Sequence, residues 1–155
     1  MALAVLITQE KTVAATTTLG WREWGALPDL GITNIKMKVD TGAKTSCLHA
    51  FQLEPFEKNG EQWLRIWVHP RQGSNEEHMC EARIKDQRAV TDSGGHRETR
   101  YVIETTLVIG GNAFKVELTL TNRDTMKFRM LLGRQAMNGR YLVDPQASYL
   151  TGELK

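Results

Sequence analysis

Apolar and polar residues alternate in short runs along most of this chain, and few stretches keep a helical period. Residues 35–39, for example, read Ile-Lys-Met-Lys-Val, so that every second side chain is apolar. Such alternation is typical of β-strands with one buried face, and Gly, Pro, Asn and Asp separate the runs. The pattern predicts strands over residues 19–24, 34–39, 45–53, 62–69, 79–84, 101–109, 114–120 and 141–145, and residues 129–132 form a short apolar run that stops at Gly133.

The second half of the chain carries the clearest local signals. Gly110-Gly111-Asn112 joins two of the predicted strands, 101–109 and 114–120, and predicts a tight hairpin because these residues tolerate positive φ. Residues 134–138 can form a helical turn or two that ends at Gly139. Pro145 ends the last strand or confines it to an edge, where it could pair with another subunit. The polar stretch 71–78 predicts an exposed loop.

These elements predict an all-β fold with one short C-terminal helix, and the composition agrees with a single globular domain. The chain has 155 residues, of which 41% are hydrophobic and 25% charged. We expect an N-terminal extension over residues 1–18, the domain over 19–150 and a tail over 151–155.

Charge and cysteine content narrow the function classes. Twenty Lys and Arg against eighteen Asp and Glu leave a net charge of +2, which does not indicate direct nucleic-acid binding. The apolar run at residues 2–7 is too short for a membrane span and lacks the features of a signal peptide. Only two cysteines, Cys47 and Cys80, predict inert buried thiols rather than a disulfide. We therefore expect a cytoplasmic protein without a membrane partner.

The strand over residues 34–39 runs directly into Asp40-Thr41-Gly42-Ala43. Gly42 allows a sharp turn and a close approach of a substrate to the backbone, and the Thr41 hydroxyl can tie the loop down. Asp40 would then project from a rigid base. On local grounds alone the tripeptide could equally be an ordinary turn, because all three residue types are common in turns.

A second motif in the other half of the chain supports the first interpretation. The apolar pair Leu131-Leu132 is followed by Gly133-Arg134 and the short helix. Together with Asp40-Thr41-Gly42-Ala43, this arrangement resembles the retropepsin-like aspartic proteases. The four segments that carry a closer resemblance, to the RimB group often labelled "ATP-dependent zinc protease", are residues 20–24 (GWREW), 39–46 (VDTGAKTS), 118–124 (LTLTNRD) and 130–134 (MLLGR).

The resemblance implies a closed β-barrel-like fold, with Asp40 as the catalytic acid and Thr41, Gly42 and Ala43 lining the substrate cleft. Gly133 would allow close backbone packing. The family's flap would fall at Ser93-Gly94-Gly95, although an ordinary exposed turn explains these residues equally well. Asp92-Ser93-Gly94 imitates the catalytic tripeptide, but no apolar run leads into Asp92.

Aspartic-protease chemistry needs two carboxyl groups that share a proton. Two carboxyl groups so close together cannot both be ionised, because their like charges repel. The sequence offers one convincing loop of this kind, so the mechanism requires a homodimer in which each subunit contributes Asp40.

No cofactor or metal is expected. Cys47 with His49, and His78 with Cys80, could form a zinc site only if the fold brought the two pairs together, and no His-Glu-x-x-His is present. The segment Gly42-Ala43-Lys44-Thr45 lacks the spacing of a phosphate loop, so we expect no nucleotide site. Cys47 as a nucleophile is a weaker alternative, because its apolar strand favours an inert thiol.

The resemblance also implies a substrate. In the RimB group a protease is expected to trim glutamates that a RimK-type ligase adds to a ribosomal protein tail. Basic residues beside the cleft and flap, among them Lys44, Arg88, Arg97 and Arg100, would suit such a tail, although each could equally be a solvated surface charge. The alternatives are a non-catalytic dimeric module that binds an extended peptide and a zinc peptidase.

Overall fold

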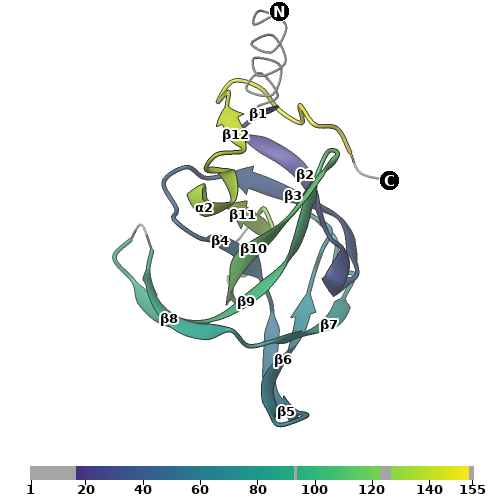
Figure 1. Cartoon of the computed structure of the whole chain (residues 1–155), viewed down its shortest axis with the longest axis vertical. Helices are drawn as coiled ribbons and strands as arrows, with labels where there is room; N and C mark the ends of the chain where they lie inside the picture. The colour runs from purple at the N-terminus through teal and green to yellow at the C-terminus, as the bar shows by residue number, and fades with distance from the viewer. Residues whose placement is uncertain (1–16, 93, 123–126, 154–155) are drawn as a thin grey trace, which may run out of the picture.

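A computed structural model describes residues 17–92, 94–122 and 127–153 (Figure 1). Strands dominate, as the alternation predicts. The elements, in chain order, are β1 Thr17–Leu19, β2 Arg22–Leu27, the 3-10 helix η1 Pro28–Leu30, β3 Ile32–Val39, β4 Ser46–His49, β5 Gln52–Lys58, β6 Glu61–Val68, β7 His78–Arg83, β8 Asp86–Thr91, β9 Arg97–Ile109, β10 Asn112–Thr121, β11 Met130–Leu132, α2 Arg134–Met137 and β12 Tyr141–Val143.

Six strands close into a barrel. Their order around it is β10-β4-β11-β3-β2-β9, and pairing of β9 with β10 completes the ring. The closed barrel and the presence of one α-helix, α2, among the described residues confirm the predicted all-β, retropepsin-like architecture. No helix in the described part of the chain has the length and apolarity needed to cross a membrane.

The barrel interior is filled by the apolar positions of the alternating strands. Ile35 and Met37 of β3 are fully buried, and so are Leu48 of β4 and Leu118 of β10. From Ile35 onward, strand β3 therefore turns its odd-numbered side chains inward and its even-numbered ones outward. The same apolar cluster continues into the three-stranded sheet β5-β6-β7 through residues such as Leu64.

The predicted hairpin is confirmed. Strands β9 and β10 pair antiparallel with Asn112 opposite Ile109, and Gly110 takes a positive φ of 57° in the turn. Strand β9 is longer than predicted, because its first half leaves the barrel and pairs with β8, which alternation did not reveal. Figure 1 shows β8 and this half of β9 as an arm that extends from the barrel.

The prediction of one strand over residues 45–53 was wrong, because this segment is divided between β4 and β5. Strand β4 ends at His49, and the chain then changes partners: the Ala50 N–H donates to Thr121 O, and the Phe51 N–H donates to Trp67 O. Pro55, expected to break the strand pattern, lies inside β5 opposite Leu64. Proline is tolerated there because β5 is an edge strand, and the side of an edge strand that faces solvent needs no backbone N–H for pairing.

Both ends of the described chain come together beside the barrel. Strands β1 and β12 form a parallel two-stranded sheet, so the edge predicted for β12 is occupied on one side by β1. Helix α2 is one turn long and ends before Gly139, close to the prediction.

Candidate active site

Asp40 lies where β3 leaves the barrel. Strand β3 is paired on both sides, with β2 and with β11, and the parallel pairing with β11 places Val39 opposite Leu132. The Asp40 N–H continues this ladder by donating to Leu132 O at 2.9 Å. The backbone of Asp40 is therefore fixed by a central strand, as expected for an acid that must hold a defined position.

The turn that follows orients the Asp40 side chain. Its Oδ1 accepts a hydrogen bond from the Gly42 N–H at 3.0 Å, and its carbonyl accepts one from the Ala43 N–H at 3.2 Å. Asp40 is half-buried, whereas Thr41 and Gly42 are exposed. The carboxylate is thus held at the rim of the barrel, with the exposed floor of the loop beside it.

The start of α2 supports the same loop from the other side. The Arg134 N–H donates to Ala43 O at 2.8 Å, and the Gln135 N–H donates to Lys44 O at 3.0 Å. The Arg134 guanidinium adds hydrogen bonds from Nη1 to Thr41 O and Gly42 O, at 3.3 and 3.1 Å. Arg134 is therefore a positioning residue that sequence reasoning missed, although it stands in the quoted 130–134 motif.

Gly133 makes this support possible. A Cβ built on it would lie 2.6 Å from Thr45 C and 2.9 Å from Ser46 N, closer than real Cβ atoms come. The Gly133 N–H donates to Ser46 Oγ at 2.9 Å. The close backbone approach predicted at Gly133 is present, and Ser46 is a second positioning residue that sequence reasoning missed.

The predicted flap residues lie at the tip of the β8–β9 arm. The Gly94 and His96 N–H groups donate to Asp92 Oδ1, and Gly95 takes a positive φ of 82°. Ser93 lies outside the described residues. Figure 1 shows the arm reaching to the side of the barrel where the 40–45 loop lies, so a role in covering Asp40 remains a prediction.

The structure separates the two predicted basic residues. Arg97 is exposed near the tip of the arm. Arg100 is only 9% exposed, is paired with Glu98, and directs Nη1 to Cys47 Sγ at 3.6 Å. The hydrogen bond from the Thr121 hydroxyl lowers the pKa of Glu98. Burial raises this pKa and Arg100 lowers it, so that the net shift is downward. Arg100 therefore joins the arm to β4.

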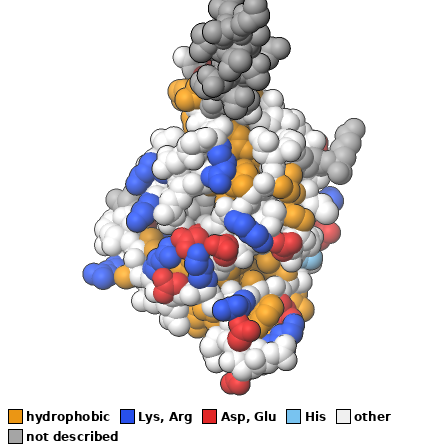
Figure 2. Space-filling view, viewed as in Figure 1, with side chains coloured by type: hydrophobic (Ala, Val, Ile, Leu, Met, Phe, Trp, Pro, Cys, Tyr) orange, Lys and Arg blue, Asp and Glu red, His pale blue; other side chains and the backbone are white. Residues whose placement is uncertain are grey.

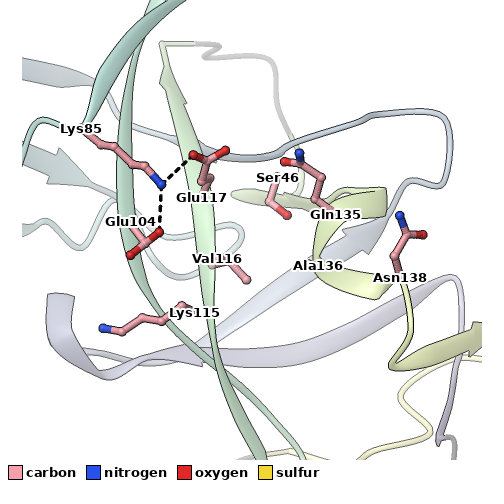
Figure 3. Close-up of a pocket in the computed structure, with 9 residues that line it drawn as sticks. All are labelled: Ser46, Lys85, Glu104, Lys115, Val116, Glu117, Gln135, Ala136 and Asn138. Carbon is pink, nitrogen blue, oxygen red and sulfur yellow. Dashed lines mark hydrogen bonds and ion pairs between the residues drawn. The ribbon is translucent and has the colours of Figure 1, made fainter.

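A hollow of about 400 Å³ lies behind the loop, between β10 and α2 (Figure 3). Lys85 contacts Glu104 and Glu117 on one side of it, each at 2.9 Å, and Ser46 and Gln135 stand on the other. The hydrogen bonds from Arg88 and then Lys85 lower the pKa of Glu117 to about 2. Asp40 does not line this hollow, which is therefore separate from the candidate site at the 40–45 loop.

The four Cys and His residues considered for zinc do not assemble. In the part of the chain that the structure describes, no three His, Cys, Asp or Glu side chains are grouped to hold a metal ion. His78 Nε2 lies 2.7 Å from Leu30 O, and neither Cys47 nor Cys80 forms a disulfide. Burial, with a smaller effect of Glu81, raises the pKa of Cys80 to about 11, which makes it an inert thiol.

Comparison with known proteins agrees with this geometry. A family model described as RimB-like, "Retropepsin-like aspartic endopeptidase RimB", matches residues 18–153. A crystal structure of Lpg0085, a Legionella pneumophila protein with unknown function, superposes with a TM-score of 0.72 at 26% identity, covering 87% of this chain and 98% of that one.

Curated relatives carry a different name. A "Probable alpha-L-glutamate ligase" of Shewanella pealeana is 48% identical over 136 residues, which are 87% of this chain and 30% of the relative. The protein of the same name from Parasynechococcus marenigrum is 48% identical over 138 residues, which are 88% of this chain and 30% of that one. The chain thus spans about 30% of the length of these curated relatives.

Proposed function

Because the chain belongs to the RimB-like family of retropepsin-like aspartic endopeptidases, we propose that it is an aspartic peptidase that works as a homodimer with one Asp40 from each subunit. The observation that carries the proposal is the fixed Asp40 loop. Its backbone is hydrogen-bonded to β11 and to the start of α2, and its carboxylate is oriented by the Gly42 N–H. An ordinary turn needs no such support from two distant segments.

The need for a second subunit follows from the chemistry. Peptide hydrolysis of this type uses two carboxyl groups that share one proton. Within the described residues, Asp92 forms a similar turn with Gly94, but it lies at the tip of the β8–β9 arm rather than at the end of a barrel strand. A second Asp40, supplied by a twofold axis, completes the pair.

In the proposed reaction, the ionised Asp40 takes a proton from a water molecule as the water oxygen attacks the scissile carbonyl carbon. The partner's Asp40 starts protonated and gives its proton to the carbonyl oxygen, which forms a tetrahedral diol. The Asp40 that took the proton from water then gives it to the amide nitrogen, a diol hydroxyl returns its proton to the partner's Asp40, and the C–N bond breaks. The products are a carboxylic acid and an amine, and the pair again holds one proton.

The proposed substrate is an acidic, glutamate-extended tail of a ribosomal protein, which is a cytoplasmic partner. The curated relatives, which contain a segment like this chain, are named as glutamate ligases, and a peptidase that removes glutamates would oppose such an activity. Lys44 and Arg97 are exposed beside the loop and on the arm, where cations would attract glutamate carboxylates.

The test is cleavage of a glutamate-extended peptide and a neutral peptide by the wild-type chain and by Asp40→Asn. We expect the variant to fold normally and to lose at least about 1000-fold in kcat, because it removes a group that acts in the reaction itself. Asp144→Asn is the matched control. Asp144 is exposed and, like Asp40, directly follows a strand and accepts at Oδ1 a backbone N–H two residues on, from Gln146 at 3.0 Å.

Two further measurements separate the alternatives. For a dimeric enzyme, the rate should rise faster than linearly with protein concentration at low concentration and should be insensitive to a chelator. Activity that survives Asp40→Asn and disappears with the chelator would instead establish a zinc peptidase. Binding of the peptide without cleavage at any protein concentration would establish a binding module.

A further inference from the structure

Three cations share the outer face of β2 and β3. Arg22 lies opposite Lys38, and Trp24 lies opposite Lys36. Because Ile35 and Met37 point into the core, Lys36 and Lys38 project from the other side of the strand. Lys38 is exposed, and Arg22 and Lys36 are half-exposed. The face is therefore basic and accessible among the described residues.

Within the described ranges, no carboxylate pairs with the cations of this face. Glu23 is the sole acid within β2 and β3, and it is fully buried. None of the three cations has an ion-pair partner among the described residues. Lys36 Nζ donates a hydrogen bond at 3.5 Å to the amide oxygen of Gln72, which carries no charge.

Two other surfaces of the molecule show the opposite arrangement. On the sheet β5-β6-β7, Arg65 pairs with Glu54 and Glu81. On the arm, Arg88 pairs with Asp86 and Glu117. Figure 2 shows basic and acidic side chains intermixed across the middle of the face on which β8, β9 and β10 run in Figure 1. The basic face of β2–β3 differs from these two surfaces, where each of these arginines has carboxylate partners.

Arg22 is also held in place for recognition. Its guanidinium lies between the rings of Trp21 and Tyr149, 4.6 and 4.9 Å from their centroids, and its Nε donates to Ser148 Oγ at 3.2 Å. Lys36 Nζ lies 5.3 Å from the Trp24 ring. A guanidinium fixed in this way presents its remaining N–H groups to an oxyanion at a reduced entropic cost.

The spacing favours an extended acidic peptide. Residues two apart in a strand are about 6.6 Å apart, so Lys36 and Lys38 match the side chains on one side of an extended chain of glutamates. The row also leads to the proposed reaction centre, because Asp40 follows Lys38 by two residues and continues the β3 ladder.

We propose that the outer face of β2–β3, formed by Arg22, Lys36 and Lys38, is an exosite that binds the upstream or downstream part of a glutamate-rich tail and guides it toward Asp40. The inference rests on the proposed function, for which it names a second contact with the substrate. It predicts that long acidic tails bind more tightly than short ones.

The test measures binding rather than cleavage, in the full chain carrying Asp40→Asn. Fluorescence anisotropy is recorded with a labelled long oligo-glutamate peptide, with diglutamate as competitor, and with a single-stranded RNA of similar charge. We expect Lys36→Gln with Lys38→Gln to weaken binding of the long peptide by roughly tenfold and to reduce its salt dependence. Arg22→Lys, which keeps the charge and loses the planar fork, should give a smaller loss.

The control removes two cations elsewhere, Lys58→Gln with Lys115→Gln, whose side chains are 46% and 64% exposed, and should bind the long peptide as the parent does. Equal binding by the Lys36/Lys38 double variant and the control would overturn the exosite. Binding of the RNA but not the peptide would overturn it in favour of a nucleic-acid surface. Peptide binding that depends on Lys36 and Lys38, without cleavage by the wild-type chain, would uphold the exosite and reject the peptidase.

Discussion

At the scale of single residues, the Asp40 loop depends on the missing side chain of Gly133 and on the hydrogen bonds of Arg134. Gly133 leaves room for the backbone of Thr45 and Ser46, and its N–H is satisfied by Ser46 Oγ. Arg134, the next residue, reaches back to two carbonyls of the loop. Two neighbouring residues after strand β11 thus hold the Asp40 loop, which lies about ninety positions earlier in the chain.

Gly133→Ala tests this packing. The added methyl would overlap backbone atoms rather than a movable side chain, so the loop or β11 must shift, and we expect a loss of about 1–3 kcal/mol in the free energy of unfolding. Urea unfolding measures this change, and peptide cleavage should fall with it because Asp40 moves.

The matched control for that substitution is Gly111→Ala, because nothing lies within 4 Å of a Cβ at this turn position and no positive φ is required there. It should change the stability little. Equal stability losses for the two alanine variants would show that the tight approach at Gly133 does not matter.

At the scale of elements, a charge network joins the arm to the barrel. Glu117 of β10 accepts hydrogen bonds from both Arg88 Nη1 and Nη2, at 2.8 and 3.0 Å, and contacts Lys85 at 2.9 Å. These bonds connect β8 and the segment before it to β10, across β9. The arm is therefore fixed at its base, while its tip carries the predicted flap glycines.

The pH dependence of stability follows from this network. Arg88 and Lys85 lower the pKa of Glu117 from an ordinary 4.5 to about 2. A carboxyl group whose pKa is lower in the folded state stabilises the fold above the unfolded pKa, and this contribution is lost as the pH falls from 4.5 toward 2. Glu117→Gln should therefore be less stable than the parent at neutral pH and should lose less stability on acidification.

Urea midpoints measured from neutral pH down to about pH 3 give the comparison. Glu61→Gln is the control, because Glu61 makes a more exposed ion pair, with Arg83 at 2.6 Å. If Glu117→Gln and Glu61→Gln showed the same acid sensitivity as the parent, the network would contribute nothing measurable to the attachment of the arm.

At the scale of the whole molecule, one buried carboxylate ties the two ends of the described chain together. Glu23 is fully buried, and it accepts hydrogen bonds from the Gly20, Leu150 and Thr151 N–H groups and from the Thr151 hydroxyl, at 2.6 to 3.1 Å. The Trp21 N–H adds a bond to Ala147 O. The C-terminal segment is thereby held along β2, where Tyr149 contacts Arg22.

Glu23→Gln should destabilise the protein by about 2–4 kcal/mol, because the amide NH₂ would face donors and leave buried N–H groups without an acceptor. Thermal or urea unfolding measures the loss, and Glu153→Gln, at an exposed residue near the same end, is the control. Loosening of residues 147–151 in hydrogen exchange should accompany the loss. An unchanged unfolding midpoint for Glu23→Gln would contradict the role of this carboxylate.

Local chemistry alone determined much of this protein. Period-two alternation identified β3 and the β9–β10 hairpin, the Gly-Gly turn set the hairpin's reversal, and the motifs around Asp40 and Gly133 pointed to one loop and its family. These features depend on neighbours within a few residues, which is why the sequence shows them directly.

Only the tertiary structure decided which strands pair and which charges are buried. Alternation did not reveal β8, because a strand outside the barrel carries polar residues on both faces. Pro55 fits within β5 because that strand lies at an edge. Arg100 can be buried because it pairs with Glu98 and contacts Cys47 Sγ. The basic face of β2–β3 likewise appears only after folding, since burial removes Glu23 from the surface and leaves Arg22, Lys36 and Lys38 together. Such outcomes depend on partners far away in the chain, whose positions no local pattern specifies.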